Sequence, residues 1–275
     1  MSLSYNLARA IGGGVPYLAS CLYSSLNKKR SRTECFNLFA WRLHRSRLRN
    51  IKLIINLPEI DGKAIIRPFS TDKTIVHEIC VDKVYEKVFK IPQKGVVIDV
   101  GAHIGLFTIK AAKIADKVIA IEPESNNFIL LLRNIMLNKL YNVLPLNVAL
   151  SDREGISYLS ICLENLGAHS LVRRRGHCIK VRTCTLDKLL QELDISLEEV
   201  SFIKLDVEDA EYLVLCGAKR LLSRGKPFIA MESEDKEVRR KVIKLLSHYN
   251  YKIFISSLYL YAYPLVNSHE DITAF

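Results

Sequence analysis

The sequence predicts an α/β protein whose centre is a mostly parallel sheet of seven strands with helices on both faces. The apolar run at 96–100 leads through a loop with two glycines into an amphipathic segment, which is the pattern of a buried strand, a tight turn and a helix. Apolar runs and helical segments then alternate, as is typical of parallel strands joined by helices. Two short apolar runs near the end predict a closing hairpin.

The expected elements begin with helices over 1–50 and a strand pair over 51–66, where Asp61-Gly62 is a hairpin signal between two apolar runs. A helix is expected over 73–90, because apolar residues recur there at helical spacing. The strands expected after it are 96–100, 117–121, 143–149, 156–162, 178–184, 200–206, 227–232, 251–256 and 258–263. The helices expected between them are 104–115, 125–138, 186–193, 209–222 and 235–248.

The chain of 275 residues has a net charge of +11, most of it near the start. Residues 1–60 hold ten Lys or Arg and two acids, which predicts a basic, mainly helical extension over 1–60 and a folded domain over 61–275. A positive face attracts anionic membrane or nucleic acid, although a solvated helix has the same composition. Residues 10–27 are uncharged but interrupted by Gly12–Gly14 and Pro16, which favours a membrane-surface helix or a helix packed on the protein over a membrane span.

The seven cysteines are scattered, and no Cys-x-x-Cys pair occurs. This argues against a zinc site and against a redox pair. An odd count without a secretory signal predicts a reducing, cytoplasmic location, with membrane association through residues 1–50 left open.

The loop after the first core strand predicts a nucleoside-containing cofactor. Gly101 and Gly105 let the backbone approach a ligand, and Glu122 ends the next apolar run, where an acid can hold ribose hydroxyls. The dinucleotide fingerprint Gly-x-Gly-x-x-Gly lacks its middle glycine here. The carboxylate of Asp99 suits the ammonium group of a methionyl moiety better than a pyrophosphate, so S-adenosylmethionine (SAM) is favoured over NAD.

Several blocks, taken in order, resemble the FkbM-type SAM-dependent methyltransferases. They are Arg67-Pro-Phe-Ser-Thr-Asp72, Ile98-Asp-Val-Gly-Ala-His-Ile-Gly105, Ala120-Ile-Glu-Pro123, Asn147-Val-Ala-Leu-Ser-Asp152, Thr185-Leu-Asp187, Ile203-Lys-Leu-Asp-Val-Glu-Asp-Ala-Glu211 and the strand ending at Glu232. The resemblance implies a class I, Rossmann-like methyltransferase domain over 61–275 and O-methyl transfer from SAM to a sugar, glycolipid or small metabolite. One departure is Asp209, where the family usually has glycine.

The cofactor residues expected on this basis surround the glycine loop and the ends of the next two strands. Asp99 and Gly101 are expected at the methionine part of SAM, although Asp99 could instead cap a helix. Glu122 is expected to bind the ribose, and Asn147 and Ala149 to flank the adenine. The remaining expected cofactor contacts are Ala102, His103, Gly105 and Pro123.

Three residues alternate along the end of the strand at 200–206, so they are expected on one face: Lys204, Asp206 and Glu208. Asp206 is the leading candidate for a general base or an orienter of the substrate hydroxyl, followed by Glu208, with Lys204 as an ion pair or a substrate contact. The expected acceptor contacts are Arg67, Asp72 and Glu232, although Arg67 and Asp72 could instead form an ion pair that closes the cofactor pocket. Carboxylates at these positions could hold magnesium, but the spacing does not indicate it, and no metal is assigned.

Other interpretations stay open at this point. The basic extension is compatible with a nucleic-acid methyltransferase, but the chain has no Asn-Pro-Pro-Tyr-type block and few aromatic residues among its basic ones, so nucleic acid is disfavoured as a partner. Asp209 is compatible with a non-catalytic SAM-binding protein. The run Arg173–Arg175 suits an anionic acceptor or a solvated loop. The sequence does not name the acceptor, since function depends on the site and not on the fold.

Overall fold

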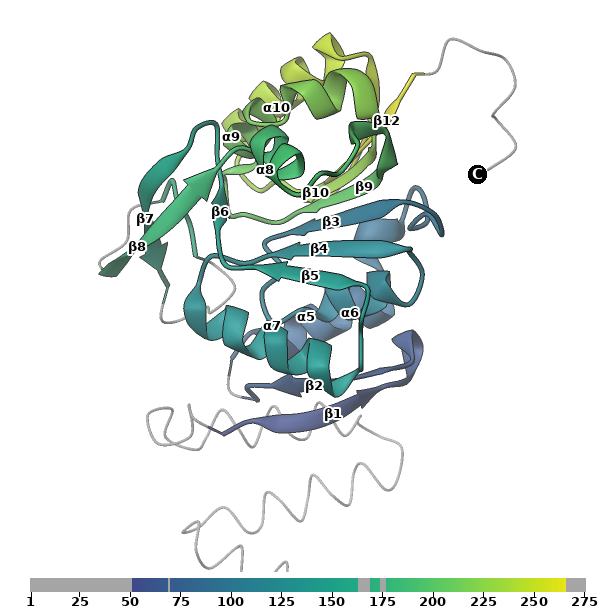
Figure 1. Ribbon diagram of the computed structural model, residues 1–275, viewed down its shortest axis with the longest axis vertical. Helices are drawn as coiled ribbons and strands as arrows, with labels where there is room; N and C mark the ends of the chain where they lie inside the picture. Colours follow the sequence, from purple (N-terminus) through teal and green to yellow (C-terminus); the bar gives the residue numbers. More distant parts are fainter. Residues whose placement is uncertain (1–50, 69, 163–168, 174–176, 266–275) are drawn as a thin grey trace, which may run out of the picture. The chain divides into compact units, whose positions relative to one another are not determined.

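The computed structural model describes residues 51–68, 70–162, 169–173 and 177–265 (Figure 1). The chain divides into two compact units: residues 1–52 with 67–70, and residues 53–66 with 71–275. The helices expected over 1–50 lie outside the described residues, and the domain boundary expected after residue 60 stays a prediction. The elements below all belong to the second unit.

Within the described residues, seven strands form the central sheet. They are β3 (Val96–Val100), β4 (Lys117–Ile121), β5 (Val143–Leu146), β9 (Val200–Leu205), β10 (Phe228–Glu232), β11 (Tyr251–Ser256) and β12 (Tyr259–Pro264). The strand order is β11-β12-β10-β9-β3-β4-β5, and β12 runs antiparallel to both of its neighbours while the other pairs are parallel. The expected mostly parallel sheet with a closing hairpin is confirmed, and this is the class I methyltransferase fold.

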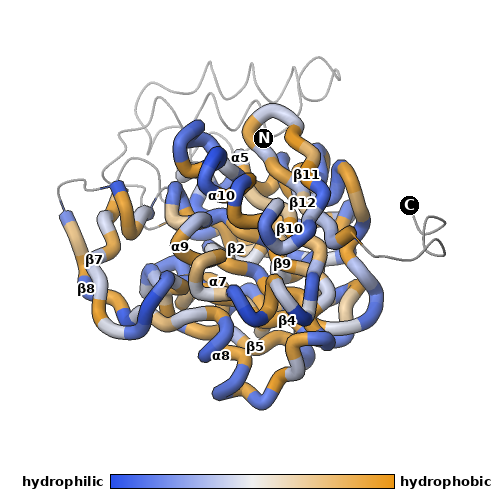
Figure 2. Tube along the Cα trace, turned by 90° about the horizontal axis from the view of Figure 1, so that it is seen from above, coloured by the Kyte–Doolittle hydropathy of each residue, from blue (hydrophilic) through white to orange (hydrophobic). Residues whose placement is uncertain are grey.

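Helices cover both faces of this sheet (Figure 1). On one side lie α6 (Leu106–Ala112) and α7 (Ser125–Leu137), and on the other α8 (Leu186–Glu192), α9 (Glu211–Cys216) and α10 (Lys236–His248). Val97 of β3 is buried in the core beside α6 and α7, whereas its neighbours Val96 and Ile98 are buried in the core beside α8 to α10. Because both faces are buried, the strands are nearly continuous apolar runs, which Figure 2 shows as orange stretches through the middle of the molecule.

The region before the sheet starts with the expected hairpin of β1 (Leu53–Leu57) and β2 (Gly62–Ile66), which pair antiparallel. Asn134 of α7 accepts a hydrogen bond from the backbone nitrogen of Ile65 at 2.6 Å, and its amide nitrogen donates to the carbonyl of Ile65 at 3.2 Å. The edge of β2 is therefore fastened to the helix that covers the sheet.

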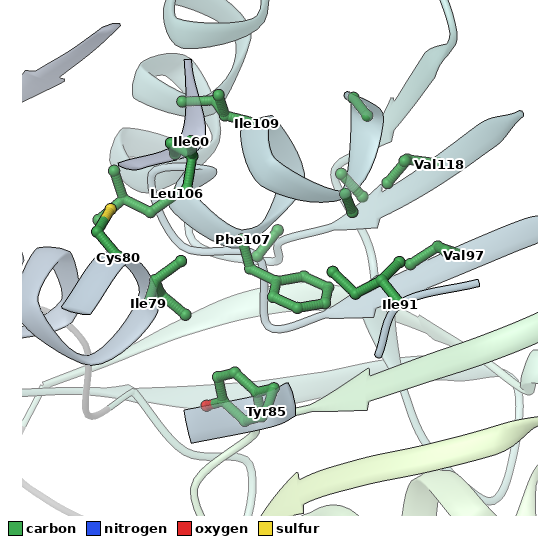
Figure 3. Close-up of a cluster of buried hydrophobic side chains, with 14 of the residues drawn as sticks. Ile60, Ile79, Cys80, Tyr85, Ile91, Val97, Leu106, Phe107, Ile109 and Val118 are labelled. Carbon is green, nitrogen blue, oxygen red and sulfur yellow. The ribbon is translucent and has the colours of Figure 1, made fainter. Parts of the chain in front are cut away.

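The single helix expected over 73–90 is wrong. The chain instead forms α5 (Asp72–Val76), a π-helical turn at His77–Asp82 and a 3-10 turn at Val84–Glu86. Lys83 has a left-handed backbone with φ of 50°, which ends the helical path before the 3-10 turn. The segments before and after Lys83 pack at different places in the core. Figure 3 shows Ile79 and Cys80 near Leu106 of α6, and Tyr85 across from Phe107.

A small second sheet stands beside the ends of the main one. It consists of β6 (Ala149–Leu150), β7 (Gly155–Ile161) and β8 (His177–Cys184) in the order β6-β8-β7. The expected pair 156–162 and 178–184 is confirmed as antiparallel β7 and β8. The strand expected over 143–149 ends at Leu146, because Ala149 and Leu150 leave the main sheet and pair with β8.

The helix expected over 209–222 is also shorter than predicted. Glu208 and Asp209 both have positive φ, so α9 begins only at Glu211, and a separate π-helical turn follows at Leu221–Gly225. Among the helices within the described ranges, none combines the length and apolar character that crossing a bilayer requires.

Candidate active site

The conformation of the glycine loop after β3 is fixed by a close backbone approach at Gly101 and by two hydrogen bonds to the end of β4. Gly101 has φ of 75°, and a Cβ there would overlap the carbonyl oxygen of Asp206. The backbone nitrogens of Gly101 and Ala102 both donate to the carbonyl of Ile121 at the end of β4, at 3.0 and 2.9 Å. The loop is thereby placed at the carboxyl ends of β3 and β4, next to the point between β3 and β9 where the strand order reverses and ligands of open α/β sheets bind.

Lys204 lies at the centre of the site. Its Nζ donates to the carbonyl of Gly101 at 2.7 Å and lies 3.2 Å from Oδ1 of Asp99 and 3.6 Å from Oδ2 of Asp206. Burial alone would lower the pKa of Lys204, but the carboxylates of Asp99 and Asp206 raise it above its ordinary value. The ammonium group is therefore a fixed positive charge between two acids.

Asp99 stands behind the pocket wall instead of in it. Its side chain is fully buried, Oδ2 accepts a 2.6 Å hydrogen bond from Thr108 of α6, and Oδ1 faces Lys204. Asp99 is in register with Lys204 across β3 and β9, which explains how the two meet. Asp99 is thus absent from the residues that line the pocket, and the cofactor contact expected of it stays a prediction.

Glu122 directly follows β4 and is a buried carboxylate that lines the pocket. Its Oε2 accepts from the backbone nitrogen of His103 and its Oε1 from that of Glu124, both at 2.8 Å. Burial raises the pKa of Glu122 to about 7, partly opposed by these two hydrogen bonds. The carboxylate is held in one orientation, as binding a ribose diol requires.

The pocket encloses about 870 Å³ of empty space, with its solvent-open mouth included. Glu122 and Pro123 line one part, and Gly101, Lys204 and Asp206 another. The other lining residues are mainly apolar and include Ile75, Ile79, Leu106, Phe107, Val148, Ala149, Leu150, Leu159 and Leu171. The pocket thus combines the carboxylate of Glu122, a glycine loop with the ammonium group of Lys204 beside it, and an apolar wall.

Asp206 and Tyr85 form the polar pair of the pocket. The hydroxyl of Tyr85 donates to Oδ2 of Asp206 at 2.9 Å, and the Tyr85 ring packs edge-on against Phe107 and Tyr259 with centroids 5.7 and 5.6 Å apart. Figure 3 shows the Tyr85 ring below Phe107. Burial, followed by the charge of Asp206, raises the pKa of Tyr85 well above its ordinary value, so the hydroxyl keeps its proton.

These residues fit SAM. The carboxylate of Glu122 suits the ribose, the apolar wall at Val148 and Ala149 suits the adenine, and the cradle at Gly101 with the charge of Lys204 suits the amino-acid tail.

A sequence model of the methyltransferase FkbM domain matches residues 99–253, which run from the end of β3 to the start of β11. The chain belongs to the FkbM methyltransferase family. It is accordingly a methyltransferase, and its cofactor is SAM.

Further relatives were found by sequence and by fold. Methyltransferase sdnD from Sordaria araneosa is 30% identical over 201 residues, which cover 60% of this chain and 77% of that protein. The crystal structure of methyltransferase FkbM from Methylobacillus flagellatus is 20% identical with a TM-score of 0.45, covering 65% of this chain and only 46% of that one. Aeropyrum pernix fibrillarin with bound SAM is 13% identical with a TM-score of 0.45, covering 67% of this chain and 74% of that one.

Several residues expected at the cofactor lie elsewhere in this FkbM-family chain. The amide of Asn147 donates to the carbonyls of Glu122 and Pro123 at 2.8 and 3.1 Å, and it supports the strand end from outside the pocket. Gly105, the N-cap of α6 with φ of 88°, is also absent from the pocket lining, and a Cβ there would meet the side chain of Leu131. Those that line the pocket are Gly101, Ala102, His103, Glu122, Pro123 and Ala149.

The expected alternation of three catalytic residues does not extend to Glu208. β9 ends at Leu205, and Glu208 has a left-handed backbone with φ of 52°, so it leaves the strand's direction. Glu208 pairs with Arg173 at 3.1 Å and lies outside the residues that line the pocket, whereas Lys204 and Asp206 are among them. Burial, followed by Asp206, raises the pKa of Glu208 to about 7.

The residues expected at the acceptor are only partly brought together. Asp72 is fully buried, with Oδ1 3.5 Å from Nε2 of His103, and is absent from the pocket lining. Glu232 ends β10 outside the lining, and burial, followed by Asp206, raises its pKa to about 9. Arg67 belongs to the other unit, where its carbonyl accepts a 2.8 Å hydrogen bond from the hydroxyl of Ser70, and its acceptor role stays a prediction.

Sequence reasoning missed other residues of the pocket. Tyr85, Glu78 and His169 line it but carry no motif, and they come from segments far from the glycine loop in the sequence. The described residues contain no group of three His, Cys, Asp or Glu side chains placed to hold a metal ion.

Proposed function

We propose that this protein transfers the methyl group of SAM to a hydroxyl oxygen of a sugar, glycolipid or small metabolite. The observation that carries the proposal is the position of Asp206. Its carboxylate lines the same pocket as Glu122 and Gly101, and it is held between the hydroxyl of Tyr85 and the ammonium of Lys204. A fixed carboxylate near the methionine end of a SAM pocket is placed to accept or orient the proton of an incoming hydroxyl.

In this proposal, one set of residues binds SAM and another orients the hydroxyl of the acceptor. Bound SAM supplies an electrophilic methyl group on a sulfonium. Glu122 holds the ribose and the Gly101 loop holds the tail, so the methyl group is fixed relative to Asp206. Oδ2 of Asp206 accepts from Tyr85, which leaves Oδ1 to accept the hydroxyl proton of the substrate. The apolar lining favours displacement of water from the pocket when cofactor and acceptor are bound.

The proposal is tested by incubating the full chain with methyl-labelled SAM and a panel of sugars, glycolipids, hydroxylated metabolites and RNA. We expect label on a hydroxyl oxygen of one small-molecule class, and loss of about a hundredfold or more of turnover in Asp206→Asn with SAM binding retained. Asp61→Asn is the matched control, because Asp61 is an exposed acid on the β1–β2 turn. Label on RNA, or full turnover by Asp206→Asn, would contradict the proposal.

We further propose that the basic extension over 1–60 brings the methyltransferase domain of residues 61–275 to an anionic membrane surface on the cytoplasmic side. The support is its net charge of +8 and the free thiols of the described cysteines, which suit a reducing compartment. Sedimentation with vesicles of mixed neutral and anionic lipid tests it. Binding that needs anionic lipid and is lost on deleting residues 1–50 is expected, and equal binding to neutral vesicles would contradict it.

A further inference from the structure

Segment 169–173 forms part of the pocket wall and is joined to β7 of the small sheet by an isolated β-bridge. Ser170 pairs with Ser160 of β7 through two backbone hydrogen bonds of 2.8 and 3.2 Å. His169 and Leu171 line the pocket, and Leu171 packs against the cluster of Ala149, Leu159 and Val181. This segment therefore borders the pocket on the side where the apolar wall lies.

Arg173, at the end of this segment, forms ion pairs with three acids that follow central strands. Nε donates to Asp209, Nη1 to Glu208 at 3.1 Å and Nη2 to Glu234 at 3.3 Å. The hydroxyl of Ser170 also donates to the carbonyl of Glu208. Glu208 and Asp209 follow β9, and Glu234 follows β10, so segment 169–173 is fastened to the ends of two central strands.

The backbone at Asp209 supports a specific role for this contact. Asp209 has φ of 75°, a conformation that favours glycine, and aspartate is tolerated there at some cost in strain. Its carboxylate is only 11% exposed and is used by the guanidinium of Arg173. The side chain of Arg173 is 26% exposed, and this partial shielding from solvent strengthens its ion pairs relative to those of a fully exposed arginine.

We propose that Arg173 is a positioning residue that fastens segment 169–173 over the cofactor pocket and thereby slows the release of SAM. We call the ion pairs of Arg173 with Glu208, Asp209 and Glu234 the clasp. It joins segment 169–173, which lines the apolar wall, to the residues that follow β9 and β10. Loosening it frees His169 and Leu171 to move away from the pocket, so bound cofactor leaves sooner while its entry is little affected. The inference rests on this pocket as the SAM site.

The experiment measures the association and dissociation rates of SAM on the full chain by stopped flow. Arg173→Ala is expected to dissociate SAM about tenfold faster with little change in association, because such interactions act mainly on the off-rate. Asp209→Gly is expected to do the same while unfolding at the same or a higher urea concentration, since glycine relieves the left-handed strain. Arg173→Lys, which keeps the charge but not the three-way contact, is expected to lie between wild type and Arg173→Ala.

Two further readouts separate a clasp from a general loss of folding. The double variant Arg173→Ala with Asp209→Gly is expected to match Arg173→Ala alone, because the ion pair of Asp209 is already lost when Arg173 is replaced. Added salt is expected to speed SAM release from the wild type but not from Arg173→Ala. Arg182→Ala, at an exposed arginine of β8, is the matched control and should release SAM at the wild-type rate.

Unchanged SAM release in Arg173→Ala and Asp209→Gly would overturn the clasp while leaving the cofactor site intact. Failure of the wild-type chain to bind SAM would overturn the pocket assignment and the clasp with it.

Discussion

The hydroxyl of Tyr85 donates a 2.9 Å hydrogen bond to Oδ2 of Asp206, across 121 positions of the chain. The contact joins the 3-10 turn before the sheet to the end of β9. Lys204 completes the arrangement, with Nζ 3.6 Å from the same carboxylate oxygen and 5.4 Å from the centroid of the Tyr85 ring. The proposed proton acceptor is thus oriented by an aromatic hydroxyl and a buried ammonium.

Replacing Tyr85 by Phe is predicted to lower kcat about tenfold while leaving the KM for SAM unchanged, because the carboxylate of Asp206 loses one orienting hydrogen bond. Tyr261→Phe is the matched control. Its hydroxyl is also buried and donates to the carbonyl of Val84, so it should lower stability without a specific effect on kcat. Steady-state kinetics on both variants check this, and an equal effect on kcat in the two would contradict the role of Tyr85.

SAM affinity is predicted to rise with pH through about 7. Burial raises the pKa of Glu122 to about 7, so below that pH the free protein holds a neutral carboxylic acid there. A ribose diol donates to the ionised form, and binding at lower pH must therefore release a proton. Between pH 6 and pH 8 the affinity should increase about tenfold. In Glu122→Gln, calorimetry should find weak binding with no such dependence, and an unchanged pH profile would contradict the assignment.

Gly101→Ala is predicted to destabilise the fold by about 2–4 kcal/mol and to abolish SAM binding, because a Cβ would overlap the carbonyl of Asp206 and strain a backbone with φ of 75°. Gly155→Ala is the control. Gly155 also has a positive φ, but a Cβ there meets nothing within 4 Å, so only backbone strain is added. Urea unfolding compares the two, and equal losses would show that the close approach at Gly101 is unimportant.

Ionisation of Glu211 is predicted to lower the free energy of unfolding as the pH rises. Burial raises its pKa from 4.5 to about 8, so the folded state holds this proton more tightly than the unfolded chain. Its contribution to stability is complete below pH 4.5 and is lost as the pH rises to about 8. Glu211→Gln should lessen this decline by about 1 kcal/mol per pH unit, whereas exposed Glu154→Gln should not. Urea unfolding at several pH values measures it; parallel profiles for Glu211→Gln and wild type would contradict it.

Much of the main sheet follows from the sequence because its strands are buried on both faces. The continuous apolar runs at β3, β4, β9 and β10 are visible without any knowledge of their partners. The glycine loop and Glu122 were predictable for the same reason, since they directly follow such runs. The ends of helices were less predictable. Lys83 and Asp209 adopt left-handed backbones, and their residue types alone do not predict this conformation.

The polar contacts of the site depend on long-range geometry that a linear pattern does not carry. Arg173 meets acids 35, 36 and 61 positions away, and nothing in the arginine run distinguishes it from a solvated loop. Asn147 was expected to touch the adenine because the strand was expected to continue, whereas β5 ends at Leu146 and the amide turns to the carbonyls of the neighbouring strand end. Tyr85 lacks a motif altogether.

Calorimetry of the full chain with SAM, S-adenosylhomocysteine and NAD tests the central claim most directly, with Glu122→Ala measured alongside. The pocket described above predicts saturable binding of SAM and S-adenosylhomocysteine, no binding of NAD, and a loss of at least about tenfold in SAM affinity in the variant. Tight binding of NAD, or SAM binding that is indifferent to Glu122→Ala, would contradict the account.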